Sequence, residues 1–267
     1  YGWGILAFST NFTVTSCTFK GLGYGIQALK TGNFRNEPHL ITDNDFYDCY
    51  IGTHTNFIQQ GTIFGNRFHL GNVPDPDLVE KAIPGSNLAG QAGALYDYLI
   101  NGFTCQENTF TKVDGNMPKT AGIVSFYLGS FNNVISKNHF YDIAIGDLAE
   151  GANSNGRTDN AASGLRYFCN EHFGISDADF AVNPGGSIHF RQGDRSDVED
   201  YKGAGNKFAY SAIYDFDNRG AAINYYYYPL GSNERPIKRN NVNALEGFIS
   251  DCVAPDPPCE PCPDVEA

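Results

Sequence analysis

The sequence contains little of what helical and membrane-spanning proteins are built from. It has one Met and one Trp among 267 residues, and apolar residues at helical spacing are nearly absent. No run of about 18 apolar residues occurs, so we expect no membrane insertion. Glycine is abundant instead, with 30 residues, as are Phe with 20 and Tyr with 16. Because aromatic side chains suit pleated surfaces and glycine suits tight turns, this composition favours an all-β protein.

Basic residues are also scarce. Lys and Arg number 18 against 30 Asp and Glu, which gives a net charge of −12. Nucleic acids attract basic surfaces through their phosphates, so this balance argues against a nucleic-acid partner. It likewise argues against bulk attraction of anionic membranes or acidic polysaccharides. The charge is typical of a soluble protein whose copies repel one another.

Recognisable catalytic motifs and a secretory signal are missing. The sequence has no Ser nucleophile elbow, phosphate-binding loop or paired zinc-ligand motif. It opens directly on the strand-like YGWGILAF, so we expect these residues to be an excerpt from a longer protein. His54 and His189 each lie alone on strand-like segments, where a lone histidine is more often a packed side chain than a base.

Cysteine is present in an odd number, seven. Four stand in apolar, strand-like contexts, where buried thiols behave as small hydrophobic side chains: Cys17, Cys49, Cys105 and Cys169. Three lie in the Pro-rich tail: Cys252, Cys259 and Cys262. One disulfide among these three is expected if the protein is extracellular. A zinc site in the tail is the alternative, but it needs a fourth ligand and a backbone that folds around the metal.

One short motif returns through most of the chain. It reads apolar-x-x-Asn-x-Phe in ITDNDF, IFGNRF, CQENTF and ISKNHF, and VTSCTF has Cys at the Asn position; YFCNEHF and GAGNKF are looser copies. The Asn positions are Cys17, Asn44, Asn66, Asn108, Asn138, Asn170 and Asn206. The Phe positions are Phe19, Phe46, Phe68, Phe110, Phe140, Phe173 and Phe208. A motif that recurs every 20 to 40 residues or so indicates stacked coils with inserted loops.

The repeat predicts a right-handed parallel β-helix, a solenoid whose equivalent residues stack in ladders. We expect Asn44 and its equivalents to turn the chain, because Asn tolerates a left-handed backbone and bonds neighbouring main chain. Phe46 and its equivalents should fill the interior. The alternative is a β-sandwich whose turns share the motif by coincidence.

Three regions are predicted along the chain. Residues 1–175 should form the β-helix coils, with a short helix over 75–83 in an inserted loop. Residues 176–250 should form last coils or capping strands. Residues 251–267 are Pro- and Cys-rich and should be a linker to a further domain.

An ordered set of motifs near the C-terminal end resembles a known family. The matches are Gly164, Leu165, Cys169, Asn170 and Phe173, then Gly186, Ile188, Gln192 and Gly193, then Gly205, Asn206 and Phe208, and finally Tyr225 to Tyr228. This order resembles the right-handed parallel β-helix regions of large secreted bacterial proteins exported by type IX secretion. The resemblance implies an extracellular or cell-surface protein. It supplies no catalytic residues.

The sequence leaves two functional hypotheses. The first is a non-catalytic module of a structural or adhesive surface protein, with polysaccharide or other surface proteins as partners and with self-assembly through the open solenoid ends. The second is a polysaccharide lyase or glycosidase working in a groove, an inference by analogy with the fold alone. A glycosidase needs two carboxylates at a set separation, and no pair is singled out. We expect no cofactor except calcium, for which Asp215 and Asp217 are weak candidates because calcium needs about six to eight oxygen ligands.

Overall fold

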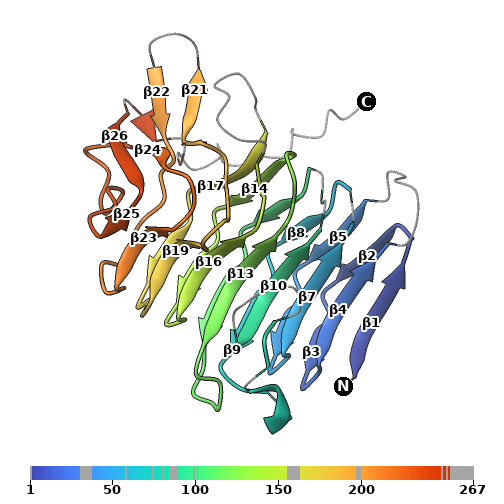
Figure 1. Ribbon diagram of the computed structural model, residues 1–267. Helices are drawn as coiled ribbons and strands as arrows, with labels where there is room; N and C mark the ends of the chain where they lie inside the picture. Colours follow the sequence, from blue (N-terminus) through green and yellow to red (C-terminus); the bar gives the residue numbers. More distant parts are fainter. Residues whose placement is uncertain are drawn as a thin grey trace, which may run out of the picture.

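The computed structural model describes residues 2–30, 38–57, 59–73, 75–79, 81–83, 89–98, 100, 102–154, 163–196, 200–247, 249–250 and 252. The strands of successive coils stack in parallel along one axis, from β1 at the N-terminal end to β25 near the other (Figure 1). The early coils each give one strand to each of three long sheets. The prediction of an all-β, parallel β-helix is confirmed.

Three long sheets run along the stack, and sheet A extends the furthest. Sheet A contains β1 (Trp3–Phe8), β4 (Tyr24–Leu29), β7 (Ile51–Asn56), β10 (Gln91–Asp97), β13 (Thr120–Phe126), β16 (Ile145–Glu150), β19 (Ala178–Val182), β23 (Tyr214–Asn218) and β25 (Arg239–Asn240). Sheet B contains β2 (Phe12–Thr15), β5 (His39–Thr42), β8 (Thr62–Phe64), β11 (Thr104–Gln106), β14 (Asn132–Ser136) and β17 (Gly164–Phe168). Sheet C contains β3 (Thr18–Lys20), β6 (Asp45–Tyr47), β9 (Arg67–Leu70), β12 (Thr109–Lys112), β15 (His139–Tyr141) and β18 (Glu171–Phe173).

The phenylalanines of the motif form one column inside the coils. Successive register partners are Phe19, Phe46, Phe68, Phe110 and Phe140. Their neighbouring ring centroids are 4.7 to 5.1 Å apart, and all five rings are buried. Each ring also packs against a glycine of sheet A; a Cβ at Gly93 would lie 2.5 Å from Phe110. Burying each ring contributes roughly 1.5–3 kcal/mol, so the column is a large part of the core.

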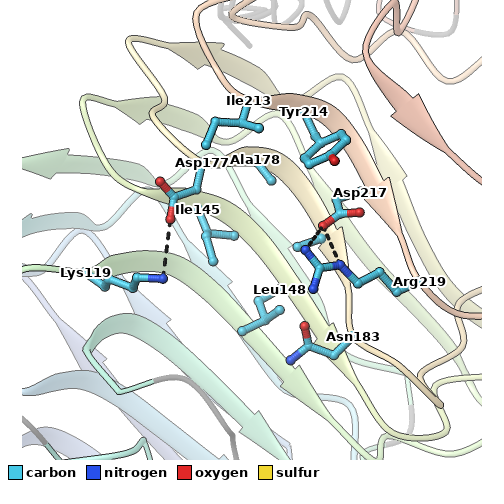
Figure 2. Close-up of a pocket in the computed structure, with 11 residues that line it drawn as sticks. Lys119, Ile145, Leu148, Asp177, Ala178, Asn183, Ile213, Tyr214, Asp217 and Arg219 are labelled. Carbon is cyan, nitrogen blue, oxygen red and sulfur yellow. Dashed lines mark hydrogen bonds and ion pairs between the residues drawn. The ribbon is translucent and has the colours of Figure 1, made fainter.

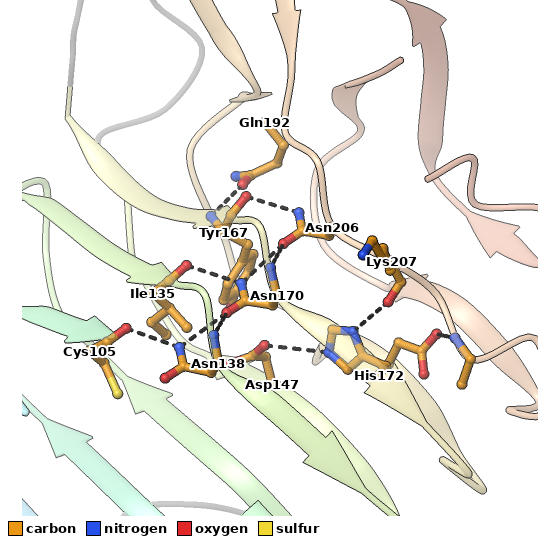
Figure 3. A network of polar contacts seen from close by, with 12 residues as sticks. Cys105, Ile135, Asn138, Asp147, Tyr167, Asn170, His172, Gln192, Asn206 and Lys207 are labelled. Atoms are coloured by element: carbon orange, nitrogen blue, oxygen red, sulfur yellow. Dashed lines mark hydrogen bonds and ion pairs between the residues drawn. The ribbon is translucent and has the colours of Figure 1, made fainter. Parts of the chain in front are cut away.

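The asparagines form a second, hydrogen-bonded column. Asn44, Asn66, Asn108, Asn138, Asn170 and Asn206 are all fully buried. Asn138 is typical: its Nδ2 donates to Asn170 Oδ1 and to the Cys105 carbonyl, both at 3.0 Å (Figure 3). At the first position of the column, the Cys17 backbone N–H donates to Asn44 Oδ1 at 2.9 Å. The side chains therefore connect each coil to the next.

The left-handed residue of each turn precedes the asparagine. These residues are Ser16, Asp43, Gly65, Glu107, Lys137, Cys169 and Gly205, with φ between 55° and 66°. The expectation that Asn44 adopts the left-handed conformation is therefore wrong: Asp43 adopts it, and Asn44 supplies the hydrogen bonds. A residue other than glycine costs about 1 kcal/mol in this conformation.

His172, rather than Phe173, continues the ring column. It is the register partner of Phe140, and the two ring centroids are 4.8 Å apart. Phe173 is 43% exposed and pairs with Tyr141 on the outer face. The prediction of a core position for Phe173 is wrong, because the extra residue in this copy shifts Phe by one and strand alternation turns it outward. Phe208 of the last copy is buried.

The cysteines are arranged differently from expectation. Cys252 is bonded to Cys169, 83 residues away in sequence. The expectation that Cys252 pairs within the tail is wrong, as is the expectation that Cys169 is a free thiol. Cys259 and Cys262 lie outside the described residues. Among the other described cysteines, Cys49 and Cys105 are free and buried, whereas Cys17 is free and exposed.

The coils change character towards the C-terminal end of the stack. Sheets B and C end at β17 and β18, while sheet A continues through β19, β23 and β25. Two short sheets join it there: β20 (Arg191–Gln192) with β24 (Ile223–Tyr227) and β26 (Val242–Glu246), and β21 (Asp194–Ser196) with β22 (Asp200–Gly203) and β27 (Ile249–Ser250). Residues 176–250 thus hold both further coil strands and short terminal sheets. Of the predicted linker, 251–267, the structure describes Cys252 alone.

A second apolar cluster lies on the outer face of sheet A. Leu95 and Val124 belong to it, and along their strands they alternate with the inward-facing Ala94 and Ile123. Inserted segments cover this cluster with Val73, Leu78, Ile83 and Met117. The helix predicted over 75–83 is reduced to the 3-10 turn η1 (Pro76–Leu78). Since η1 is the longest helix in the described part of the chain, no described helix has the length that spanning a bilayer requires.

Candidate functional site

A groove lies on the outer face of sheet A, beside the inserted segments. Its lining residues are Lys119, Ile145, Leu148, Asp177, Ala178, Ala181, Asn183, Ile213, Tyr214, Asp217 and Arg219. They come mainly from three neighbouring strands, β16, β19 and β23, and from the residues that flank them. Figure 2 shows one ion pair on each side of an apolar floor.

Strand register builds the floor. Ile145 pairs with Ala178, which pairs with Tyr214, so one row crosses the three strands. In the parallel row Leu148 pairs with Ala181, which pairs with Asp217. Ile145, Leu148, Ala178 and Ala181 belong to the apolar cluster on the outer face of sheet A, and Tyr214 packs against it, so both rows face away from the coil interior. The small alanines of β19 leave the floor low between the bulkier residues of β16 and β23.

Asp177 and Lys119 form one rim of the groove. Lys119 Nζ lies 3.7 Å from Asp177 Oδ2, and the side chains are 54% and 37% exposed. The other carboxylate oxygen, Asp177 Oδ1, accepts a hydrogen bond from Ser176 Oγ at 3.1 Å. Both oxygens of this carboxylate are therefore engaged within the protein.

Asp217 and Arg219 form the opposite rim. Arg219 donates from Nε to Asp217 Oδ2 at 2.8 Å, and its Nη2 lies 2.8 Å from the same oxygen. Asn240 Nδ2 donates to Asp217 Oδ1 at 2.7 Å. The carboxylate is 8% exposed, whereas the Arg219 side chain is 57% exposed. This pair is therefore fixed from two sides and offers its guanidinium, rather than its carboxylate, to solvent.

The groove has the chemistry of a binding surface. Its floor is apolar, and its rims retain hydrogen-bond donors, because an ammonium carries three N–H groups and a guanidinium five. The Tyr214 hydroxyl can donate and accept. Asn183 donates from Nδ2 to Glu150, which leaves its carbonyl oxygen as an acceptor. An apolar floor with a small number of polar groups around it is typical of small-molecule and saccharide sites.

The predicted calcium candidates face different surroundings. Asp215 is fully buried, and its Oδ2 accepts hydrogen bonds from the backbone N–H groups of Ile237 and Lys238, at 2.6 and 3.0 Å. Asp217 lines the groove and is held by Arg219. Within the described residues, no three His, Cys, Asp or Glu side chains come together as a metal site. The two carboxylates thus do not converge on one point.

The two strand histidines are built into local networks. The His54 ring has Gln27 Nε2 at 2.9 Å from Nδ1 and Asp97 Oδ2 at 3.5 Å from Nε2, so both nitrogens are engaged. His189 is buried, and its Nε2 lies 3.3 Å from Arg166 Nη2. Neither histidine lines the groove. Both therefore act as packed side chains.

A pair of titratable groups lies sealed inside the coils. His172 Nε2 is 3.8 Å from Asp147 Oδ2, and both side chains are at most 1% exposed. Burial raises the pKa of Asp147 well above its usual value and lowers the pKa of His172 to about 3. Burial therefore disfavours the charged form of both partners in this contact (Figure 3). Such a closed pair has no access to a ligand.

Sequence reasoning missed most of the groove. Of the four charged residues of the groove, sequence reasoning singled out Asp217 alone, as a weak calcium candidate. Arg219 follows Asp217 by two residues, a spacing that signals a shared strand face. Lys119 lies in a turn-rich stretch, and its sequence gives no sign that it meets Asp177, 58 residues later in the chain.

Comparison with known proteins identifies a family. Searches of the curated proteins and of the solved structures each gave no match. A family model described as "Right handed beta helix region" matches residues 3–200, which is more than half of the chain. The match covers β1 to β21, the ring column from Phe19 to His172, and the asparagine column except Asn206. The chain therefore belongs to the right-handed β-helix region family.

Proposed function

We propose that this chain is a non-catalytic β-helical module of an extracellular bacterial structural or adhesive surface protein, and that its groove binds polysaccharide. The observation that carries the proposal is the state of the groove carboxylates. Asp177 Oδ1 and both oxygens of Asp217 accept hydrogen bonds within the protein, and Asp177 Oδ2 lies 3.7 Å from Lys119 Nζ. A general acid or base must contact the substrate, and in this arrangement both carboxylates contact cations of the protein instead. The groove is therefore better suited to binding than to bond cleavage.

An extracellular location is supported by the Cys169–Cys252 disulfide. Disulfides persist in oxidising environments and are rare in the reducing cytosol. This bond ties the end of the described chain to the turn between β17 and β18, so it supports a module that must stay folded outside the cell. Export by type IX secretion, implied by the sequence resemblance, remains a prediction.

Self-association remains a prediction as well. The strands β1, β2 and β3 are the terminal members of sheets A, B and C, so one edge of each carries no neighbour within the described residues. Such edges are able to pair with another chain. Trp3, Leu6 and Phe8 on β1 are each more than 40% exposed, which adds apolar surface at this end.

A carbohydrate-active enzyme is the alternative, favoured by one observation: two carboxylates and two cations line the same groove. A glycosidase would use the carboxylates as acid and base, and a lyase would use a cation to neutralise an acidic sugar. Either mechanism requires that the present ion pairs open on substrate binding. The alternative is therefore tested by whether any bound polysaccharide is shortened.

The test is a glycan array probed with the purified protein, with and without calcium, followed by size analysis of every glycan that binds. Binding that is insensitive to calcium and leaves the glycan intact is the expected result. Cleavage of a bound chain would replace the adhesive proposal with the enzymatic one. A protein that binds no glycan in either condition would remove polysaccharide from its partners.

A further inference from the structure

We infer that the ligand of the groove is a neutral polysaccharide, held across β16, β19 and β23 with the apolar faces of its sugar rings on the floor. This inference rests on the proposed polysaccharide-binding function and adds the chemical class. It depends on three features of the groove: its charge balance, its floor and its unused hydrogen-bonding groups. Each is a property of described residues.

The charges in the groove cancel. Lys119 is paired with Asp177 and Arg219 with Asp217, so the lining carries two positive and two negative side chains. A uronic acid or a sulfated sugar would bring a further negative charge beside Asp177 and Asp217, which repel it. The net charge of −12 opposes acidic chains at long range as well. A neutral sugar meets neither penalty.

The floor matches the apolar faces of sugar rings. Ile145, Leu148, Ala178 and Ala181 form a low apolar floor and are each at most 9% exposed, so most of the accessible apolar area belongs to Ile213, which is 64% exposed beside it. The C–H groups of a pyranose can pack on such a surface, and removing that area from water contributes about 25 cal/mol per Å².

The rims offer the groups that hydroxyls need. The N–H groups of Lys119 and Arg219 that are not committed to Asp177 and Asp217 remain as donors, and the Tyr214 hydroxyl donates or accepts. Because three strands about 4.8 Å apart make up the groove, it spans about 10 Å, enough for about two sugar units. The groove therefore binds a short segment within a polysaccharide chain. A longer chain binds with higher apparent affinity, because it offers many equivalent segments.

The experiment is affinity electrophoresis of the whole protein in native gels that contain one soluble polysaccharide each. The neutral probes are mixed-linkage β-glucan and galactomannan, and the acidic probes are polygalacturonate and alginate. Ile213→Asp is the groove variant, chosen because this exposed side chain is not needed for folding. Leu230→Asp, at a position that is 82% exposed and outside the groove, is the matched control. A second groove variant, Lys119→Ala, removes a donor without adding a charge.

The inference predicts retardation by a neutral probe that persists when ionic strength is raised from about 20 mM to about 500 mM. Ile213→Asp should weaken that binding at least about tenfold, and Leu230→Asp should leave it unchanged. Preferential binding of an acidic probe would overturn the inference and leave the adhesive proposal standing. Neutral binding that both groove variants leave intact would also overturn it, since the site would lie elsewhere. Binding of no probe would overturn the inference and the proposed function together.

Discussion

Removing one amide from the asparagine column is expected to cost a large part of the stability of the fold. The Asn138 side chain makes four hydrogen bonds: it donates to Cys105 O and Asn170 Oδ1 and accepts from the backbone and side-chain N–H groups of Asn108. Each such bond contributes about 1 kcal/mol net, so Asn138→Ala should lower the free energy of unfolding by about 4 kcal/mol. The loss is large because all four partners are then left in a water-free interior.

The assay is urea unfolding followed by far-ultraviolet circular dichroism. Asn132→Ala is the control, since Asn132 is exposed on β14, the strand that precedes Asn138. This variant should change the free energy of unfolding by no more than about 0.5 kcal/mol. In the wild-type protein, the backbone N–H of Asn108 should exchange with solvent among the slowest amides, because a buried side chain accepts it. A loss below about 1 kcal/mol for Asn138→Ala would refute the view that the column is a structural network.

Three further changes test other parts of the fold. Lys137→Gly should raise the free energy of unfolding by about 1 kcal/mol, because glycine adopts the left-handed backbone of this position without strain, whereas Lys137→Ala should not raise it. Equal stabilities of the two variants in urea unfolding would contradict the strain assigned to Lys137. Cys252→Ser should lower the free energy of unfolding by about 4 kcal/mol, because the disulfide to Cys169 closes a long loop. Cys17→Ser is the control and should leave the free energy of unfolding nearly unchanged, since Cys17 is free and exposed. The measurement is the urea midpoint of each variant in non-reducing buffer. Burial raises the pKa of Asp179 to about 8 from 3.8, so its contribution to stability is full below about pH 4 and is lost as pH rises towards 8. Asp179→Asn should therefore gain stability relative to wild type between pH 5 and pH 8 in urea titrations, and parallel pH profiles would contradict the assignment.

The fold was predictable because a solenoid repeats its internal contacts. Residues that stack in space, such as Phe46 and Phe68, also occupy the same position in the motif, so the pattern in the sequence maps onto a column in the structure. The turn geometry was predicted less well. Asn44 and Asp43 are adjacent in sequence, and both residue types tolerate a left-handed backbone, so composition alone does not decide which adopts it.

The wrong prediction of a core position for Phe173 has a different cause from the wrong prediction of the left-handed turn residue. One additional residue in YFCNEHF exchanged the inward and outward faces, so His172 took the core position and Phe173 the surface. A motif match that tolerates an insertion hides this change, because side-chain direction in a strand alternates with each residue.

The groove was hardly predictable. Lys119 and Asp177 meet because sheet A places β13 beside β16 and β16 beside β19, and the loops between these strands differ in length. The outward residues of a coil also carry no ladder constraint, so they leave no repeating signal. The Cys169–Cys252 disulfide was missed for a related reason: the three tail cysteines are close in sequence, whereas the true partner is brought near by the fold.

The most direct test of binding without cleavage is the viscosity of a neutral polysaccharide solution to which the protein is added. Viscosity responds strongly to chain length, so a few cleavages per chain are detectable. We predict that the protein sediments with the polysaccharide while the viscosity holds steady over a day. A progressive fall in viscosity that disappears in Asp177→Asn or Asp217→Asn would contradict the account, because it would assign a catalytic role to carboxylates that are held here in ion pairs.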